Sequence, residues 1–184
     1  MSNSYKNLKD YAFSEHEEAL RILMKVFDSF SICYFLIGAQ ARDVHFYQKG
    51  IKPARGTRDI DFAVMVQDME QYQELISALK EKGFKETNDP YRLNWAQGDT
   101  VIDLLPFGQI EQDYTVNFDE RKIELNVIGF RELNDELQEL YLGDDHSISL
   151  PVPPLHGLFL LKLLSWDDKR PDREKDLKDL NQIL

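Results

Sequence analysis

The sequence predicts an α/β or α+β fold in which helices and strands alternate around a mixed central sheet. Short apolar runs of strand length lie at residues 34–37, 60–66 and 100–105, and segments with the helical spacing of apolar residues lie between them. The strands at 59–66 and 100–105 also carry aspartates, which buried strands seldom contain. We therefore expect the acidic side chains of these strands to gather at one place on the sheet.

The composition places the chain among globular proteins and narrows its partners. Of its 184 residues 42% are hydrophobic, which is enough for one domain with its own core. The net charge of −11 argues against broad binding to nucleic acid, which requires a basic surface. The single cysteine excludes an internal disulfide. Because the first residues are polar and no long apolar stretch follows, we expect a cytoplasmic protein without signal peptide or membrane segment.

The first half of the chain is expected to alternate between helices and strands. Ser14 and Glu17 form a capping box at the start of the first helix, and Asp68 caps the third. His16, in the first helical turn, is expected to be solvated. The expected order is helix Ser14–Ser31, strand Tyr34–Ile37, helix Ala39–Gln48, strand Asp59–Val66 and helix Met69–Lys82.

The second half is expected to contain a hairpin that adds a third acid to the sheet. The turn Gln97–Asp99 joins strands Tyr91–Trp95 and Thr100–Leu105, which brings Asp103 beside the strand of Asp59 and Asp61. The Pro-rich stretch Ser147–Leu155 predicts an extended connection. The remaining expected elements are strands Phe84–Thr87 and Lys122–Ile128, and helices Glu132–Leu142, Leu155–Ser165 and 172–183.

Asp59 and Asp61 are the first candidates for a functional site. They alternate with Ile60 and Phe62 at a period of two, so both carboxylates leave the same face of the strand, roughly 7 Å apart along the chain. This arrangement suits convergence on one or two hard cations, since proteins commonly hold Mg²⁺ by one or two carboxylates and substrate phosphates. The alternative is a partly exposed edge strand with solvated acids.

The segment from Arg42 to Arg58 is basic within an acidic protein, and Asp43 is its only acid. Arginine binds phosphate oxygens through paired hydrogen bonds, and Arg55 and Arg58 come immediately before the aspartates. The alternative is a solvated loop. The basic residues of the segment are Arg42, Lys49, Lys52, Arg55 and Arg58.

Gly38 separates a predicted strand from a predicted helix. A glycine at such a turn lets backbone N–H groups approach a phosphate at the helix N-terminus. The alternative is that the turn requires glycine only because its backbone adopts a φ angle that other residues disfavour.

Together these motifs resemble the nucleotidyltransferase superfamily that shares its palm with DNA polymerase beta, and in particular the small bacterial AbiEii toxins. The turn Gly38-Ala39-Gln40-Ala41 is similar to the family's G-G-x-A, and Arg55–Asp61 is similar to its R-x-S/T-x-D-[IL]-D strand. Ala39 departs from the usual Gly or Ser and offers no hydroxyl. A later K…R…KD…D pattern is matched by Lys162, Arg170, Lys175-Asp176 and Asp179.

The resemblance implies a nucleotidyltransferase palm with an N-terminal helix over residues 1–150, and a helical segment over residues 151–184 packed on it as one compact unit. It also implies an Mg²⁺-dependent enzyme, with Mn²⁺ as the alternative metal. The enzyme would transfer a nucleoside monophosphate from an NTP to a hydroxyl of a small molecule, an RNA end or a protein. It would act as a toxin with an antitoxin protein as its partner.

The resemblance also assigns roles to individual residues. Catalysis and metal binding fall to Asp59, Asp61 and Asp103. Nucleotide binding falls to Gly38, Ala39, Arg55, Thr57, Arg58 and Lys162. The alternative function is a nucleotide-binding or partner-binding protein that keeps the scaffold but has lost the chemistry, and Ala39 favours it.

Overall fold

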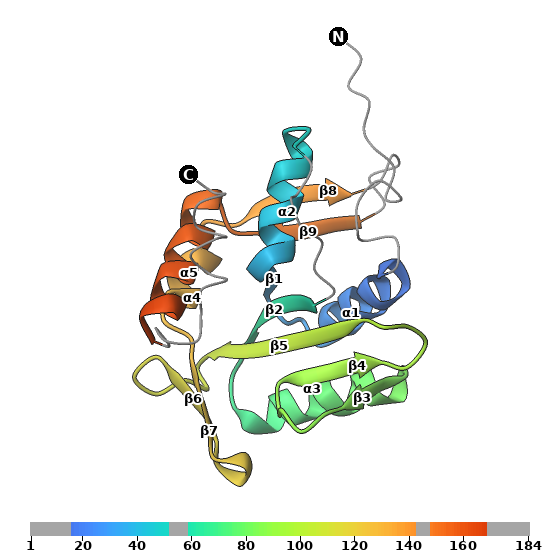
Figure 1. The fold of residues 1–184 in the computed structure, drawn as a ribbon. Helices are drawn as coiled ribbons and strands as arrows, with labels where there is room; N and C mark the ends of the chain where they lie inside the picture. Colours follow the sequence, from blue (N-terminus) through green and yellow to red (C-terminus); the bar gives the residue numbers. More distant parts are fainter. Residues whose placement is uncertain (1–15, 52–58, 143–147, 169–184) are drawn as a thin grey trace.

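A five-stranded sheet lies at the centre of the computed structural model, which describes residues 16–51, 59–142 and 148–168. Its strand order is β1-β2-β5-β4-β3 (Figure 1). Strands β2 and β5 pair in parallel and the other neighbours pair antiparallel, so the predicted mixed sheet is confirmed. The strands are β1 Tyr34–Ile37, β2 Asp59–Val66, β3 Phe84–Glu86, β4 Arg92–Trp95 and β5 Val101–Gly108.

Two helices, α1 (Glu17–Ser29) and α3 (Met69–Glu81), close one face of this sheet. On that face the rings of Phe27 and Phe62 meet edge to face at 5.6 Å, and Tyr72 Oη donates a hydrogen bond of 2.9 Å to the Leu104 carbonyl. The predicted cap of α3 is confirmed, because the Asp68 side chain accepts a hydrogen bond from the Gln71 backbone N–H. The core therefore fills the space between these helices and the strands β2 and β5.

Among the described residues, helices cover the opposite face along only part of its length. Helices α2 (Gly38–Gln48) and α5 (Leu155–Asp168) contact each other, and α2 also contacts β2. The short helix α4 (Phe130–Asn134) packs at the far end, where the Phe130 ring meets those of Phe35 and Phe107. Figure 1 shows α2, α4 and α5 on the side of the sheet away from α3. Within the described residues, no helix is both long and apolar enough to cross a membrane.

The second half of the chain contains more strand than the sequence predicts. The expected helix Glu132–Leu142 is wrong, because it divides into α4 and the strand β8 (Gln138–Leu142). The Pro-rich stretch is extended as expected, but it forms the strand β9 (Ile148–Val152) paired with β8. Its alternating residues Ile148, Leu150 and Val152 are buried, so a period of two decides the structure here.

A second small ribbon and one tertiary contact also differ from expectation. The predicted strand at 122–128 is confirmed as β7 (Ile123–Asn126), and it pairs with β6 (Thr115–Phe118), which is not predicted. His16 is buried rather than solvated, and its Nδ1 lies 2.6 Å from Thr100 Oγ1. His16 thereby ties the start of α1 to the start of β5. Ser14 and the expected helix 172–183 lie outside the described residues.

Candidate active site

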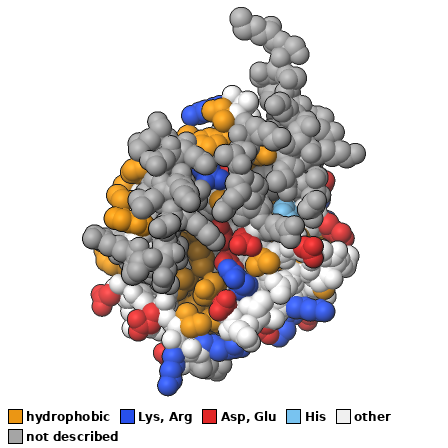
Figure 2. Space-filling model, in the orientation of Figure 1, with side chains coloured by type: hydrophobic (Ala, Val, Ile, Leu, Met, Phe, Trp, Pro, Cys, Tyr) orange, Lys and Arg blue, Asp and Glu red, His pale blue; other side chains and the backbone are white. Residues whose placement is uncertain are grey.

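Three aspartates meet at one end of the central strands. Asp59 and Asp61 are the first and third residues of β2, and Asp103 is the third residue of β5. Asp61 is the direct register partner of Asp103 in the parallel pair, so both side chains leave the same face of the sheet. Figure 2 shows acidic and basic side chains meeting over β5 beside a hollow lined by hydrophobic ones. The predicted clustering is therefore present, while the catalytic and metal-binding roles stay predictions.

Asp61 has the most perturbed environment of the three acids. Its pKa rises from the ordinary 3.8 to about 7, first because the carboxyl is withdrawn from water and then because Asp103 and Asp59 are like charges nearby. Lys162 and Arg92 lower the same pKa. At neutral pH the Asp61 carboxyl is thus close to its titration midpoint, and a cation beside it would favour the ionised form.

Gly38 packs directly against Asp61. Its φ is +71°, and a Cβ at this position would collide with Asp61 Oδ2. The approach arises because Ile37, the last residue of β1, is the antiparallel partner of Asp61. Gly38 and Ala39 then begin α2, whose N-terminus favours negative charge. The glycine is therefore required here both for its φ angle and for room beside a carboxylate.

Arg92 belongs to the site although the sequence motifs do not predict it. Its Nε and Nη2 donate to the two carboxylate oxygens of Asp103, both at 2.7 Å. The two residues are antiparallel partners in β4 and β5. The pKa of Arg92 is raised mainly by this hydrogen bonding. The predicted hairpin contains the signal, because counting outward from the turn Gln97–Asp99 brings residue 92 opposite residue 103.

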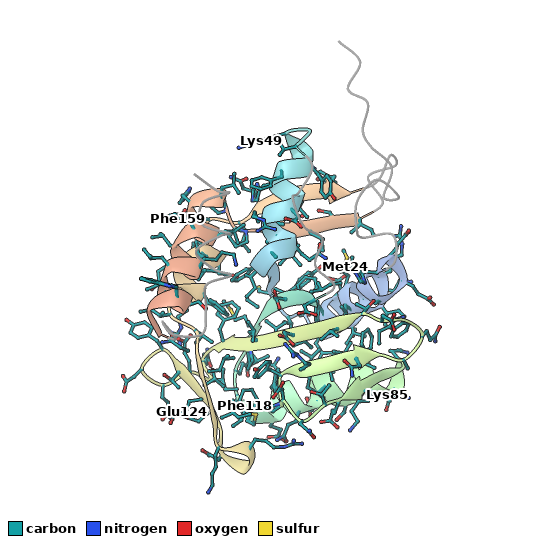
Figure 3. All side chains as sticks on the ribbon, viewed as in Figure 1. Met24, Lys49, Lys85, Phe118, Glu124 and Phe159 are labelled. Carbon is teal, nitrogen blue, oxygen red and sulfur yellow. The ribbon has the colours of Figure 1, made fainter. Side chains whose placement is uncertain are left out.

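The basic residues of segment 42–58, together with Thr57 and Lys162, divide into three groups. Lys162 on α5 is half-buried and lowers the pKa of Asp61, so its ammonium group lies near the acids. Arg42 is buried in an ion pair with Asp43 at 2.6 Å, and Lys49 lies at the far end of α2, about 15 Å along the helix from Gly38 (Figure 3). Outside the described residues lie Lys52, Arg55, Thr57 and Arg58.

The donor set fits a metal held by two of the three acids. Among the residues that the structure describes, no three His, Cys, Asp or Glu side chains are grouped so that they could hold one ion. Both oxygens of Asp103 accept hydrogen bonds from Arg92, so the predicted role of Asp103 as a third metal ligand stays a prediction beside the pair Asp59 and Asp61. Two carboxylates together with substrate phosphates are a common way to hold Mg²⁺. The chemistry of the site therefore suits Mg²⁺ or Mn²⁺ arriving with a nucleotide.

A model of the family described as "Nucleotidyl transferase AbiEii toxin, Type IV TA system" matches residues 46–184, which is more than half of the chain. The match includes the strands of all three aspartates and helix α5. No curated protein sequence matches the chain.

Several solved structures share the fold at low sequence identity. The lincosamide antibiotic adenylyltransferase LnuA, bound to lincomycin, is 19% identical with a TM-score of 0.52, and the match covers 91% of this chain and 95% of that one. ANT(2″)-Ia in complex with adenylyl-2″-tobramycin is 14% identical with a TM-score of 0.53, and the match covers 91% of this chain and 86% of that one. An antigenic nucleotidyltransferase-like protein from Paracoccidioides brasiliensis is 16% identical with a TM-score of 0.54, and the match covers 92% of this chain and 75% of that one. At these identities the likeness establishes a nucleotidyltransferase fold.

The close contact between Gly38 and Asp61 predicts the effect of adding a methyl group. We expect Gly38→Ala to lower the free energy of unfolding by about 2 kcal/mol or more, through backbone strain at positive φ and collision with the carboxylate. Gly50 is a matched control, since it has the same φ of +71° and no atom of the described residues within 4 Å of its Cβ position. Gly50→Ala should therefore cost only about 1 kcal/mol. Urea unfolding measures both, and equal losses would contradict the collision.

The raised pKa of Asp61 predicts a pH-dependent gain in stability from Asp61→Asn. The folded state holds the Asp61 proton more tightly than the unfolded state, so ionisation costs stability as the pH rises from about 4 to 7. Asparagine does not ionise. In EDTA the variant should exceed wild type by about 1–4 kcal/mol at pH 8, and the gain should shrink towards pH 4. A gain of the same size at pH 5 and pH 8 would show that ionisation is not its cause.

Proposed function

The chain belongs to the AbiEii nucleotidyl transferase family, and from this premise we propose a metal-dependent enzyme that transfers a nucleoside monophosphate from an NTP to an acceptor hydroxyl. The observation that carries the proposal is the meeting of Asp59, Asp61 and Asp103 on one face of β2 and β5. The N-terminus of α2 lies beside them at Gly38, and a helix N-terminus is a favourable place for phosphate. Carboxylates for a cation and a phosphate site thus lie next to each other.

Each residue of the site has a proposed role in the transfer. Asp59 and Asp61 would hold Mg²⁺ or Mn²⁺, which when bound neutralises the charge of the triphosphate. Asp103 would accept the proton of the acceptor hydroxyl while that oxygen bonds to the α-phosphorus and pyrophosphate leaves with the electrons of the broken P–O bond. Lys162 would offset the negative charge near Asp61. Phosphate contacts would come from Gly38, Ala39, Arg55, Thr57 and Arg58.

Charge argues against the RNA end as the acceptor, and the ligands of two proteins with this fold favour a small hydroxylated molecule over a protein hydroxyl. A net charge of −11 disfavours a polyanion such as RNA. LnuA and ANT(2″)-Ia, which share the fold, carry lincomycin and adenylyl-2″-tobramycin in their structures. The family description supports a toxin within a toxin–antitoxin system, with an antitoxin protein as partner.

The second candidate function is nucleotide or partner binding without catalysis. Ala39 favours it, because a hydroxyl that could contact phosphate is missing from the turn. The two functions differ in whether any labelled product forms.

Incubation with each α-labelled NTP, Mg²⁺ and a cell extract tests the proposed transfer. We expect a labelled product with wild type and a loss of at least about 100-fold with Asp59→Asn, because the cation site loses a ligand. Glu74→Gln is the control, since Glu74 is exposed on α3, beyond the closed face of the sheet. If no NTP labels any component while NTP still raises the melting temperature of wild type, binding without catalysis is the function.

Lys162→Ala should lower kcat/KM for the NTP by about tenfold or more, because a positive charge near the triphosphate is lost. Its melting temperature should change little, since Lys162 is only half-buried. Lys85→Ala is the control, because Lys85 is exposed on the edge strand β3 (Figure 3). Unchanged kinetics in Lys162→Ala, or a loss of the folded state, would assign Lys162 a structural role.

A further inference from the structure

The guanidinium of Arg92 holds the Asp103 carboxylate in a fixed orientation. Both hydrogen bonds measure 2.7 Å, and they join two nitrogens of the fork to two different oxygens. The Asp103 side chain is 11% exposed and that of Arg92 is 36% exposed. The pair therefore lies at the edge of the core, where one partner fixes the other while the guanidinium still faces solvent.

The backbone and a second acid fix Arg92 in turn. Arg92 and Asp103 are direct partners across β4 and β5, so both Cα atoms are held by the sheet. The Arg92 N–H donates to the Asp89 carbonyl at 3.1 Å, and Arg92 Nη1 lies 3.8 Å from Asp89 Oδ2. The guanidinium thus lies between two carboxylates, and its short contacts are those to Asp103.

This orientation separates Asp103 from the other two acids of the site. A divalent cation on Asp59 and Asp61 that also took an Asp103 oxygen would compete with the Arg92 hydrogen bonds, and the Arg92 charge would repel it there. A neutral hydroxyl meets no such repulsion, and each carboxylate oxygen keeps a further lone pair for it. We propose that Arg92 is a positioning residue, an inference that rests on the nucleotidyl transfer proposed above. It keeps Asp103 out of the cation site of Asp59 and Asp61 and holds it for the acceptor hydroxyl.

A simpler role for Arg92 is to supply one positive charge to an acidic cluster. Lys162 supplies such a charge without a fork, and its influence on Asp61 exceeds that of Arg92. If only charge mattered, Lys162→Met would strengthen cation binding at least as much as Arg92→Met. Arg92→Lys would then leave cation binding unchanged, because lysine keeps the charge but not the paired hydrogen bonds.

Titration of the full chain with Mn²⁺, with free Mn²⁺ followed by electron paramagnetic resonance, separates the two roles. We expect Arg92→Met to bind Mn²⁺ about tenfold more tightly than wild type, because Asp103 becomes available as a ligand. Arg92→Lys should show part of this gain, and Lys162→Met should gain less than Arg92→Met. The proposal would be overturned if Lys162→Met gained at least as much Mn²⁺ affinity as Arg92→Met while Arg92→Lys bound like wild type. Equal Mn²⁺ affinity of wild type and both Arg92 variants would also overturn it.

Kinetics supply the second measurement. Arg92→Lys should lower kcat with little change in the KM for the nucleotide, because the base is displaced while the phosphate contacts remain. In an Asp103→Asn background, Arg92→Lys should add no further loss, since Arg92 acts through Asp103. Independent, additive losses would overturn the positioning role. If wild type transfers no nucleotide, the proposed function fails, and the Mn²⁺ titration still decides whether Arg92 withholds Asp103 from the cation.

Discussion

The crowding of three carboxylates at one end of a half-buried sheet is the constraint on which the site depends. The parallel register places Asp61 directly beside Asp103, and Asp59 leaves the same face of β2 two residues earlier. Burial and like charge together raise the pKa of Asp61 to about 7. Such a cluster persists only if neighbouring groups compensate it. The surrounding elements supply that compensation in three different ways.

The three compensating elements come from distant parts of the chain. Gly38 lets the N-terminus of α2 approach the Asp61 carboxylate, Arg92 neutralises Asp103 from β4, and Lys162 acts on Asp61 from α5. Because the negative charge is balanced by several groups and not by one, a bound cation can replace one of these groups with little rearrangement. The arrangement is consistent with a site that binds a metal and a nucleotide together, and costly for a purely structural sheet end.

Local patterns in the sequence predict the sheet and the acids, but not the contacts between distant elements. Period-two alternation predicts β2, and the hairpin turn predicts that Asp103 lies beside it. The same hairpin register could also have predicted Arg92. By contrast, the approach of Gly38 to Asp61 depends on how β1 pairs with β2, which no local pattern encodes. A helix is expected at 132–142 because Leu133, Leu137 and Leu140 have helical spacing. That prediction is wrong because residues 138–142 pair with the later strand β9, and this pairing determines the structure.

The face of the sheet that carries the aspartates changes along β5 from charged to aromatic. From Asp103 the same face continues through Leu105 to Phe107, which meets Phe35 and Phe130 edge to face. Each such ring pair contributes about 0.5–1.5 kcal/mol beyond its buried area. Strand β4 pairs only with residues 101–103 of β5, so Pro106, which has no N–H, lies where β4 does not require a donor. The aromatic half of the strand therefore packs in the core against β1 and α4, and the half paired with β4 carries the charged groups.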